Sequence, residues 1–497
     1  MPLGRYLLER NVVDPEQLEE ARRHQKTSGG TLIESLEALG FVSHEELASL
    51  LDAAPPSPDS IEETGLDRNF LLHFLLKTCY VHGFETSHQL SRFTKIPEPL
   101  VEELLDEMKQ KRLAEVLGLT LDRGAFRYSL TDLGRQWASG ALQQCQYTGP
   151  APVTLERYQE QVARQSITRE RVTPQGMERA LAHLVLAEDV ARRLGPAVSA
   201  ARSILLYGAP GNGKTSIAEA LGDVFEQEIL VPYCIAVDGQ IVKIFDPAVH
   251  RPVPAREEPS AVETLEATLA QADRTPGGGA AEAPRYAMDQ LLPDARWVRC
   301  RRPVVTTGGE LTMEMLDLRF DPVAKFYEAP GHVKATGGVF IIDDFGRQRV
   351  SPQELVNRWI LPLEKRLDYL TLHTGKKLQM PFDDLVVFST NFPPGELFDG
   401  AGLRRIPYKL HIDAPQFQDF VRILRSVCKA RGLAVGDEVV AYLLNDFYPR
   451  TRTPLSCAHP VLLVDHALER SRFEGSEPRL DLAVVREAVQ NLIVEKD

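Results

Sequence analysis

The chain has 497 residues, of which 43% are apolar and 26% charged, and its 57 Lys and Arg against 70 Asp and Glu give a net charge of -13. This length predicts roughly three or four domains of a globular protein. The negative charge opposes contact with a polyanion over the whole surface, so nucleic-acid binding is not expected. No apolar run is long enough to span a bilayer and no export signal is expected, which predicts a cytoplasmic protein without membrane insertion. The six cysteines lack a Cys-x-x-Cys pair, which disfavours a zinc site and a disulfide scaffold.

Residues 1–52 contain two similar halves. A shift of 29 positions aligns the apolar pattern that begins at Leu3 with the one that begins at Leu32. Each half is expected to form a short helix, a turn capped by Asp14 or Ser43, and a second helix. The pattern resembles the small N-terminal domain of type II secretion and type IV pilus assembly ATPases, which in some members binds cyclic di-GMP.

A cyclic di-GMP site is one of two alternatives that this resemblance leaves open. The ligand-binding versions carry Arg-Leu-Gly in each repeat, whereas residues 2–4 are Pro-Leu-Gly and residues 31–33 are Thr-Leu-Ile. Phosphate groups favour such fixed guanidinium groups, and both are missing here. We therefore expect a protein-docking module rather than a dinucleotide sensor.

A proline-rich linker over 53–67 precedes a second domain over 68–145. Three helices and a pair of strands around Arg123 and Gly124 are expected, an order similar to a winged helix. DNA recognition would use the third helix, but acidic residues outnumber basic ones there and would repel phosphates. We expect a protein-interaction or spacer domain, with DNA binding as the alternative. The charged residues of this helix are Glu98, Glu102, Glu103, Asp106 and Glu107 against Lys109, Lys111 and Arg112.

Residues 146–412 alternate between expected strands and helices, which predicts an α/β core built on a parallel sheet. Two additions are expected within it: a hairpin that turns at Asp238 and Gly239, and an insertion over 247–300 rich in Gly, Ala and Pro. Residues 413–497 are expected to form an α-helical lid. The predicted architecture is thus a small all-α repeat domain, a winged-helix-like domain, an α/β core and an all-α lid.

The segment LLYGAPGNGKTSIAEAL, residues 205–221, matches the phosphate-binding pattern GxxxxGK[ST], with an expected strand before it and a helix after it. Glycines let backbone N–H groups turn inward around a β-phosphate, while Lys214 reaches the β- and γ-phosphate oxygens. The hydroxyl of Thr215 is expected to bind Mg²⁺. We therefore predict an ATP site formed by Gly208, Ala209, Pro210, Gly211, Asn212, Gly213, Lys214, Thr215 and Ser216.

Two later strands end in polar residues that would complete this site. The stretch GGVFIIDD (337–344) ends in Asp343, expected to hold Mg²⁺, and Asp344, expected to polarise the attacking water. Glu is more usual at the second position, and the shorter Asp places its carboxylate about 1.5 Å further back, so slow hydrolysis is an open alternative. The stretch DDLVVFSTN (383–391) places Asn391 where it would orient that water.

These motifs, with LRRIPYKLHI (403–412) and a helical C-terminus, resemble the AAA+ ATPases over about 180–497. The resemblance implies that Arg404 and Arg405 are presented to the γ-phosphate of a neighbouring subunit, with exposed surface arginines as the alternative. A guanidinium group supplied in this way makes hydrolysis depend on assembly, here an expected homo-hexamer. More narrowly, the stretches at 301–305, 308–330 and 354–377 resemble a bacterial group of ATPases with chaperone activity, associated with pilus assembly or secretion.

Two features depart from the AAA+ pattern. The arginine of the lid that senses nucleotide belongs near the start of the third lid helix, where this chain has Val461; Arg452 and Arg470 are the candidates to replace it. The core also carries insertions, which typically decorate the face that meets substrate. Phe326 and Tyr327 are therefore candidates for pore-facing aromatics that grip a polypeptide, with core packing as the alternative.

Together these features predict an AAA+ ATPase that binds and hydrolyses ATP with Mg²⁺ in a ring. Its expected task is to remodel or assemble an unidentified protein partner that the N-terminal domains recruit, in pilus assembly or secretion. Two alternatives stay open. One is a nucleotide-gated signalling scaffold that responds to cyclic di-GMP, which Asp344 and Val461 favour; the other is a DNA-acting motor, which only the winged-helix-like order supports.

Overall fold

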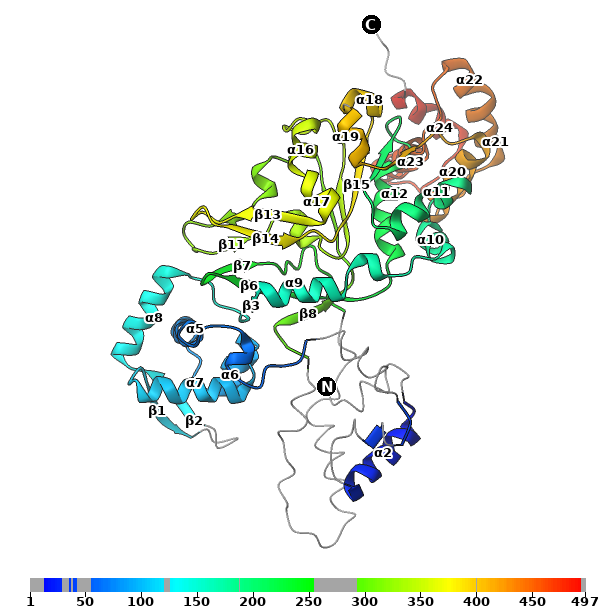
Figure 1. Cartoon of the computed structure of the whole chain (residues 1–497). Helices are drawn as coiled ribbons and strands as arrows, with labels where there is room; N and C mark the ends of the chain where they lie inside the picture. The colour runs from blue at the N-terminus through cyan, green and yellow to red at the C-terminus, as the bar shows by residue number, and fades with distance from the viewer. Residues whose placement is uncertain are drawn as a thin grey trace. The chain divides into compact units, whose positions relative to one another are not determined.

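The structure is a computed structural model that describes residues 13–28, 35–36, 39–42, 55–119, 126–186, 188–253, 293–398 and 400–492. Figure 1 follows the chain from blue at the N-terminus to red at the C-terminus. The chain forms two compact units, and each is built from separate stretches of sequence. The first comprises Met1–Gln165, Glu228–Arg301 and Arg319–Ala329, and the second Ser166–Gln227, Arg302–Leu318 and Pro330–Asp497.

This division differs from the continuous core expected over 146–412. The start of that range up to Gln165, and the stretches Glu228–Arg301 and Arg319–Ala329, belong to the first unit. The reason is strand pairing, because four of their strands join β3 (Val153–Thr154) in one sheet, and the other two pair with each other. The spacing of nucleotide-binding motifs carries no information about which sheet the intervening strands join.

Several sequence-based expectations lie outside the described residues. These are most of the repeat over 1–52, including residues 2–4 and 31–33, the turn at 123–124 and residues 254–292 of the insertion. Helix α2 (Pro15–Ser28) is described, and it begins as predicted at the cap Asp14. The Oδ1 atom of Asp14 accepts a hydrogen bond from the backbone N–H of Gln17 at 2.8 Å, and Oε1 of Gln17 accepts one from the backbone N–H of Asp14 at 3.0 Å.

Within 68–144, the described residues of the first unit form four helices and one antiparallel pair of strands. Helix α5 begins at Asp67, whose Oδ1 atom accepts from Phe70 N at 3.0 Å, and it ends at Gly83, whose φ is 65°. Leucines from the first three helices build a common core with the start of β1. The order of elements matches the one expected, while the assignment to a winged helix stays a prediction. The elements are α5 (Arg68–His82), α6 (Ser87–Thr94), α7 (Glu98–Gln110), β1 (Ala114–Leu119), β2 (Phe126–Leu130) and α8 (Asp132–Gln144).

A mixed sheet forms the rest of the first unit, with the strand order β10-β11-β7-β6-β3. The predicted hairpin is confirmed, since β6 and β7 pair antiparallel across Asp238 and Gly239, whose φ values are 50° and 74°. A separate ladder joins β5 and β8, and helix α9 (Leu155–Arg164) follows β3. The strands are β5 (Ile229–Pro232), β6 (Cys234–Val237), β7 (Gln240–Lys243), β8 (Trp297–Cys300), β10 (Arg319–Phe320) and β11 (Tyr327–Glu328).

Phe326 and Tyr327 pack in the interior of the first unit. The side chain of Tyr327 is fully buried, and Phe326 is partly buried against the core of this unit, with its ring 5.7 Å from that of Tyr147. This packing favours the core-packing alternative for both residues, and for Tyr327 full burial excludes a ring displayed to solvent.

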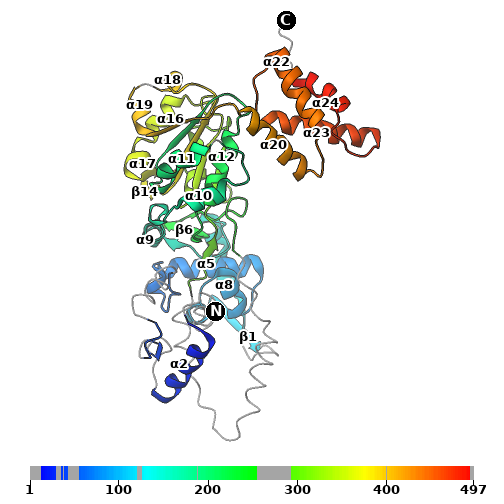
Figure 2. The ribbon, with the colours of Figure 1, turned by 90° about the vertical axis from the view of Figure 1, so that its right-hand side faces the viewer.

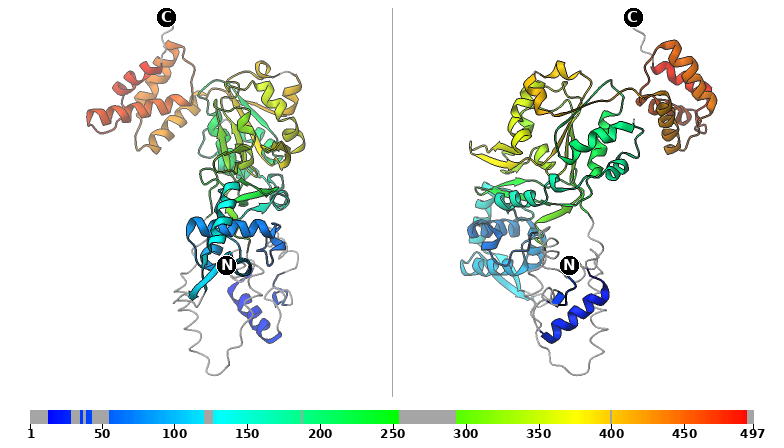
Figure 3. Two further views of the ribbon diagram at one scale, coloured as in Figure 1. Left: turned by 90° about the vertical axis from the view of Figure 1, so that its left-hand side faces the viewer. Right: turned by 45° about the vertical axis from the view of Figure 1, so that its right-hand side comes forward.

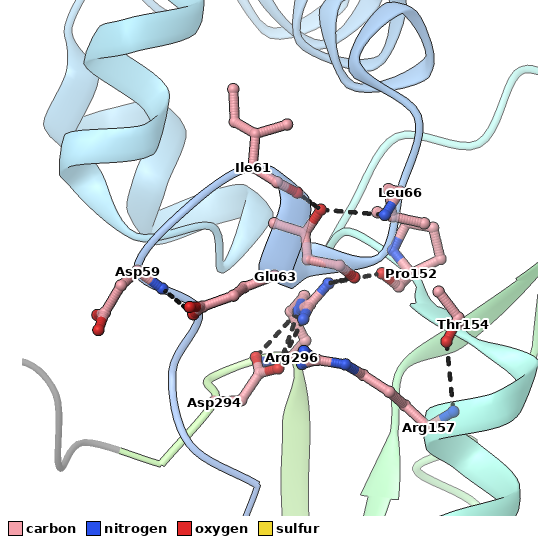
Figure 4. A network of polar contacts seen from close by, with 10 residues as sticks. Asp59, Ile61, Glu63, Leu66, Pro152, Thr154, Arg157, Asp294 and Arg296 are labelled. Atoms are coloured by element: carbon pink, nitrogen blue, oxygen red, sulfur yellow. Dashed lines mark hydrogen bonds and ion pairs between the residues drawn. The ribbon is translucent and has the colours of Figure 1, made fainter.

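A buried ion pair joins three segments of the first unit, as Figure 4 shows. The guanidinium group of Arg296 contacts both carboxylate oxygens of Asp294, at 2.7 to 3.1 Å, and both side chains are 1% exposed. The same group donates to the carbonyl oxygens of Thr64 at 3.4 Å and Pro152 at 3.0 Å. Arg296 therefore connects two other segments to the start of β8: the one that contains Thr64 and the one that leads into β3.

Asp294→Ala should strongly destabilise the first unit, because it leaves a buried guanidinium group without its counter-ion. We expect the free energy of unfolding to fall by about 3–5 kcal/mol. The matched control is Glu228→Ala, which removes the half-exposed partner of Arg299 in the same unit and should cost about 0–1 kcal/mol. Urea unfolding followed by tryptophan fluorescence measures both, and equal losses would contradict the assignment.

The second unit is built on a parallel sheet with the order β16-β4-β15-β12-β9. Its strands are nearly continuous apolar runs, as expected for a sheet covered on both faces. The carboxyl ends of all five strands meet at one edge, and β4 is followed directly by the glycine-rich segment. The strands are β4 (Ile204–Tyr207), β9 (Val304–Thr307), β12 (Val339–Ile342), β15 (Leu385–Thr390) and β16 (Tyr408–His411).

Helices cover both faces of this sheet, and alternate residues of each strand face each layer. Ile341 and Val387 pack with helices α10, α11 and α12, whereas Phe340 and Phe388 pack with α16 and α19. The green and yellow helices lie on opposite sides of the sheet in Figure 3, right. The bounds are α10 (Pro174–Leu181), α11 (Glu188–Ser199), α12 (Lys214–Ala220), α16 (Pro352–Arg358), α17 (Ile360–Lys365), α18 (Pro394–Leu397) and α19 (Gly400–Arg405), with a hairpin of β13 (Leu367–Thr371) and β14 (Lys377–Pro381).

The C-terminal part of the second unit is α-helical, as predicted, and its helices gather in one bundle in Figure 2. Its core contains apolar residues from each helix, including Phe420, Phe447 and Leu463. None of the helices in the described part of the chain has the length and apolar character needed to cross a membrane. The lid helices are α20 (Phe417–Ala430), α21 (Asp437–Tyr442), α22 (Tyr448–Thr451), α23 (Ala458–Glu474) and α24 (Leu482–Ala488).

Candidate functional site

The loop between β4 and α12 has the backbone that its glycines permit. Gly208, Gly211 and Gly213 have φ values of 145°, 79° and 81°, which residues with a side chain rarely adopt. A Cβ atom on Gly208 would lie 2.4 Å from the carbonyl oxygen of Ile412, and one on Gly211 would lie 2.4 Å from Ser456 Oγ. The loop therefore depends on glycine for both its curvature and its close packing.

Lys214 begins helix α12 and turns its ammonium group back into the loop. Its Nζ atom donates to the carbonyl oxygens of Gly208 at 3.0 Å and Ala209 at 2.8 Å, and to Oδ1 of Asn391 at 2.8 Å. Burial lowers the pKa of Lys214, while the charges of Asp343 and Asp344 act to raise it. The site therefore holds a desolvated cation, for which an anionic ligand is favourable.

The two carboxylates after β12 contact different partners. Thr215 Oγ1 donates to Asp343 Oδ2 at 2.8 Å, which places both predicted Mg²⁺ ligands together. Asn391 Nδ2 donates to Asp344 Oδ1 at 3.2 Å. The structure thus joins the predicted Lys214, Asn391 and Asp344 in one network, and beside it pairs Thr215 with Asp343.

The Thr215 hydroxyl and the Asp343 carboxylate fit a magnesium ion that is bound together with a nucleotide. Mg²⁺ usually takes one or two protein oxygens and completes its octahedron with waters and phosphate oxygens. The Thr215 hydroxyl and the Asp343 carboxylate supply such a pair. A cage made by protein alone is not seen, because the described residues contain no cluster of three or more metal-binding side chains.

A cavity of about 510 Å³ opens over this network within the second unit. One wall is apolar and comes from the segment before α11 and from the lid, while the other is the glycine-rich loop. Among the described residues that line it, Lys214 is the only lysine or arginine. The lining includes His183, Leu184, Val185, Leu186, Pro210, Ser216, Ser389, Ile423, Ser426, Val427, Cys457, Ala458 and Val461 besides the loop and the network.

The lid contacts the glycine-rich loop directly. Ser456 Oγ and Ala458 N both donate to the carbonyl oxygen of Gly211 at 3.0 Å. Helix α23 begins at this contact, and Val461 on its first turn lines the cavity. These two bonds fasten the start of the lid helix α23 to the glycine-rich loop.

The structure does not place either candidate for the sensing arginine in this cavity. Arg470 is bonded to Glu474 and Glu487, each at 2.8 Å. Arg452 has a left-handed backbone at the end of α22, with a φ of 52°, and is absent from the described lining. The lid thus presents Val461 where the AAA+ pattern implies a cation.

Arg404 and Arg405 lie at the end of α19, before β16 begins at Tyr408. They are at the amino edge of the sheet, whereas the glycine-rich loop is at the carboxyl edge. The carbonyl oxygen of Arg405 accepts from Ser203 Oγ at 3.0 Å, which fixes it beside the start of β4. Arg404 is exposed, and Arg405 contacts Glu364 at 3.3 Å. The fold therefore separates both arginines from the cavity of their own chain.

Two contributions to the site, and one contact of the predicted residue Asn212, were not foreseen from the sequence. The segment His183–Leu186 forms an apolar wall, Ser456 binds the loop from the lid, and Asn212 donates from Nδ2 to the carbonyl oxygen of Ile412 at 3.2 Å. The apolar run Leu184–Leu186, which lies between α10 and α11, is a weak signal for the first. The other two are contacts across about 200 positions of sequence, which no local pattern encodes.

The parallel sheet carries the glycine-rich loop directly after β4 and a helix directly after the loop, which is the arrangement of a phosphate-binding loop. Residues 416–491 match a family described as a domain of unknown function, DUF8689. No curated protein matches the chain. Solved structures that are similar include NtrX from Brucella abortus, with 12% identity and a TM-score of 0.35 over 65% of this chain and 54% of that one.

Two further similar structures have comparable scores. NtrX in complex with ATP is 13% identical with a TM-score of 0.34, over 73% of this chain and 67% of that one. The RuvB Holliday junction branch migration motor of Thermotoga maritima is 14% identical with a TM-score of 0.31, over 61% of this chain and 69% of that one. The chain spans about half the length of the first of these structures.

Lys214→Ala should abolish nucleotide binding, because it removes the only ammonium or guanidinium group among the described residues that line the cavity. A fluorescent ATP analogue titrated into the variant should show no saturable signal up to concentrations that saturate the unaltered chain. Lys429→Ala, on the exposed side of α20, is the matched control and should bind normally. Retained tight binding by Lys214→Ala would refute the site.

Proposed function

We propose that the chain is an ATPase of the AAA+ kind that binds and hydrolyses ATP with Mg²⁺ and works as a homo-oligomeric, hexameric ring. Its task is to remodel or assemble a protein partner, in pilus assembly or secretion. The single observation that carries the ATPase proposal is the connected network of Lys214, Asn391 and Asp344 beside the pair formed by Thr215 and Asp343.

Each side chain of the network has a distinct chemical task in this proposal. Lys214 neutralises the negative charge of phosphate oxygens. A phosphate is a better partner for its ammonium group than the neutral amide of Asn391, so the nucleotide would replace Asn391 in this contact. Asn391 then remains bonded to Asp344 and orients the water that this carboxylate polarises. Thr215 and Asp343 hold Mg²⁺, which supplies charge stabilisation to the phosphate groups.

The position of the two arginines supports a role between subunits. An arginine at the amino edge of the sheet is too far from its own loop to stabilise charge there, but it is available to another copy. A guanidinium group supplied by a neighbour typically raises phosphoryl-transfer rates about 10³–10⁵-fold. Since the described lid residues add no cation to the cavity, the positive charge missing from it would come from the adjacent subunit.

The lid supplies a route from nucleotide to movement. Its contact with the loop, from Ser456 and Ala458 to Gly211, lies where phosphates would change the loop. A shift of this contact rotates the helical bundle against the sheet, which is a hinge of the usual kind. The first unit, with the expected docking module, is the part that would recruit the partner protein.

Asp344→Asn should trap ATP while leaving its affinity nearly unchanged, because the amide keeps the size of the side chain but not its basicity. Turnover should fall by about 100-fold or more, by analogy with the loss of a general base. Phosphate release measured beside ATP binding separates the two effects. Continued turnover at the original rate would contradict the assignment of Asp344 as the general base.

Arg404→Ala and Arg405→Ala should each be tested for turnover as a function of protein concentration. The unaltered chain should show specific activity that rises as subunits assemble. At least one of the two variants should lose this rise while still binding ATP, because its own cavity is intact. Arg422→Ala, an exposed arginine on α20, is the control. Unchanged, concentration-dependent turnover in both variants would rule out a role between subunits.

A further inference from the structure

The turn after β12 displays Asp344 at the cavity, and it begins where the sheet ladder ends. Asp343 N donates to the carbonyl oxygen of Thr307 at 2.8 Å, and Phe345 N donates to that of Ser389 at 2.7 Å. Asp344 lies between them with a φ of 48°, a left-handed conformation that is uncommon for residues with a Cβ atom. Something other than the strand must therefore hold this residue in place.

Gln348 meets this requirement through both ends of its carboxamide. Its Nε2 atom donates to the carbonyl oxygen of Asp343 at 2.8 Å and lies 3.3 Å from that of Asp344. Its Oε1 atom accepts from Gly346 N at 2.8 Å. One side chain thus bonds to the backbone on both sides of the Asp344 side chain and to the turn that follows.

The chemistry of the partners fixes the orientation of this carboxamide. Nε2 faces three carbonyl oxygens, because it also lies 3.3 Å from that of Gly308 at the end of β9, and Oε1 faces an N–H group. The flipped amide would place its oxygen against three acceptors. Gln348 therefore also fastens the turn to the neighbouring strand.

The rest of the turn is held independently of Gln348. The ring of Phe345 packs against those of Phe388 and Phe398, with centroids 5.0 and 5.4 Å apart, and Thr390 Oγ1 donates to its carbonyl oxygen at 2.6 Å. Gly346, with a φ of 101°, completes the turn. Arg347 N also donates to the carbonyl oxygen of Asp344 at 3.0 Å, so removing the Gln348 carboxamide should leave the turn folded but loosen the backbone on both sides of the Asp344 side chain.

We propose that Gln348 is a positioning residue for ATP hydrolysis, which acts by fixing the backbone from which the Asp344 carboxylate extends. The proposal rests on the function proposed above. It explains how the carboxylate of Asp344 keeps a fixed position. Aspartate has one methylene fewer than glutamate, so its side chain has little freedom to compensate for a displaced backbone. A displacement of about 1 Å in a reacting group costs about 100-fold in rate.

Two variants separate the donor from the acceptor of this carboxamide. Gln348→Leu removes both, while Gln348→Glu keeps the length and the bond from Gly346 N but places a carboxylate against carbonyl oxygens. We expect both to lower the turnover of ATP by about 100-fold with ATP affinity unchanged. Gln353→Leu, on the adjacent helix α16, is the matched control and should retain full turnover. Thermal unfolding of each variant reports whether the fold is retained.

A double variant distinguishes positioning from a general structural role. If Gln348 acts through Asp344, then Asp344→Asn combined with Gln348→Leu should turn over ATP no more slowly than Asp344→Asn alone, in single-turnover measurements. Losses that multiply in the double variant would overturn the proposal, as would full turnover in both single variants. A general loss of stability that also weakens ATP binding would overturn it too. An unaltered chain that binds no ATP would instead refute the proposed function itself.

Discussion

The site depends on one interaction, the contact of a buried ammonium group with neutral oxygen atoms. Lys214 is surrounded by two carbonyl oxygens of its own loop and by the amide oxygen of Asn391. Burial lowers its pKa, and the nearby carboxylates only partly offset this. A cation so placed gains more from a phosphate than from the groups that now surround it. The glycine-rich loop, the sheet edge and the lid contact together make this arrangement possible.

The connected side chains could be predicted because of the geometry of parallel sheets. Lys214, Asp343 and Asn391 each follow a separate apolar strand, and the carboxyl ends of parallel strands meet at the same edge. The sequence therefore shows which residues gather, although about 130 positions separate the first two and about 50 the last two. The cap at Asp14 and the turn at Asp238 and Gly239 were predictable for a different reason, because both depend on local backbone chemistry.

Other features depend on contacts that no local pattern encodes. The strands between 228 and 301 join two sheets of the first unit, and Tyr327 and Phe326 pack against the interior of that unit. The lid contact from Ser456 to Gly211 spans 245 positions. Gln348 was missed because a glutamine after a turn carries no signal until its four backbone partners are known. Residues that bind are thus easier to predict than residues that hold the binding residues in place.

The most direct test is a crystal structure of the chain with Mg²⁺ and a non-hydrolysable ATP analogue. The account predicts phosphate oxygens within hydrogen-bond distance of the backbone N–H groups of residues 211–215, with the Lys214 ammonium group turned from Asn391 toward them. It also predicts a Mg²⁺ ion that contacts the hydroxyl group of Thr215 and lies next to the carboxylate of Asp343. An analogue bound elsewhere, or a loop in which Lys214 keeps its contact with Asn391 at saturating analogue, would contradict it.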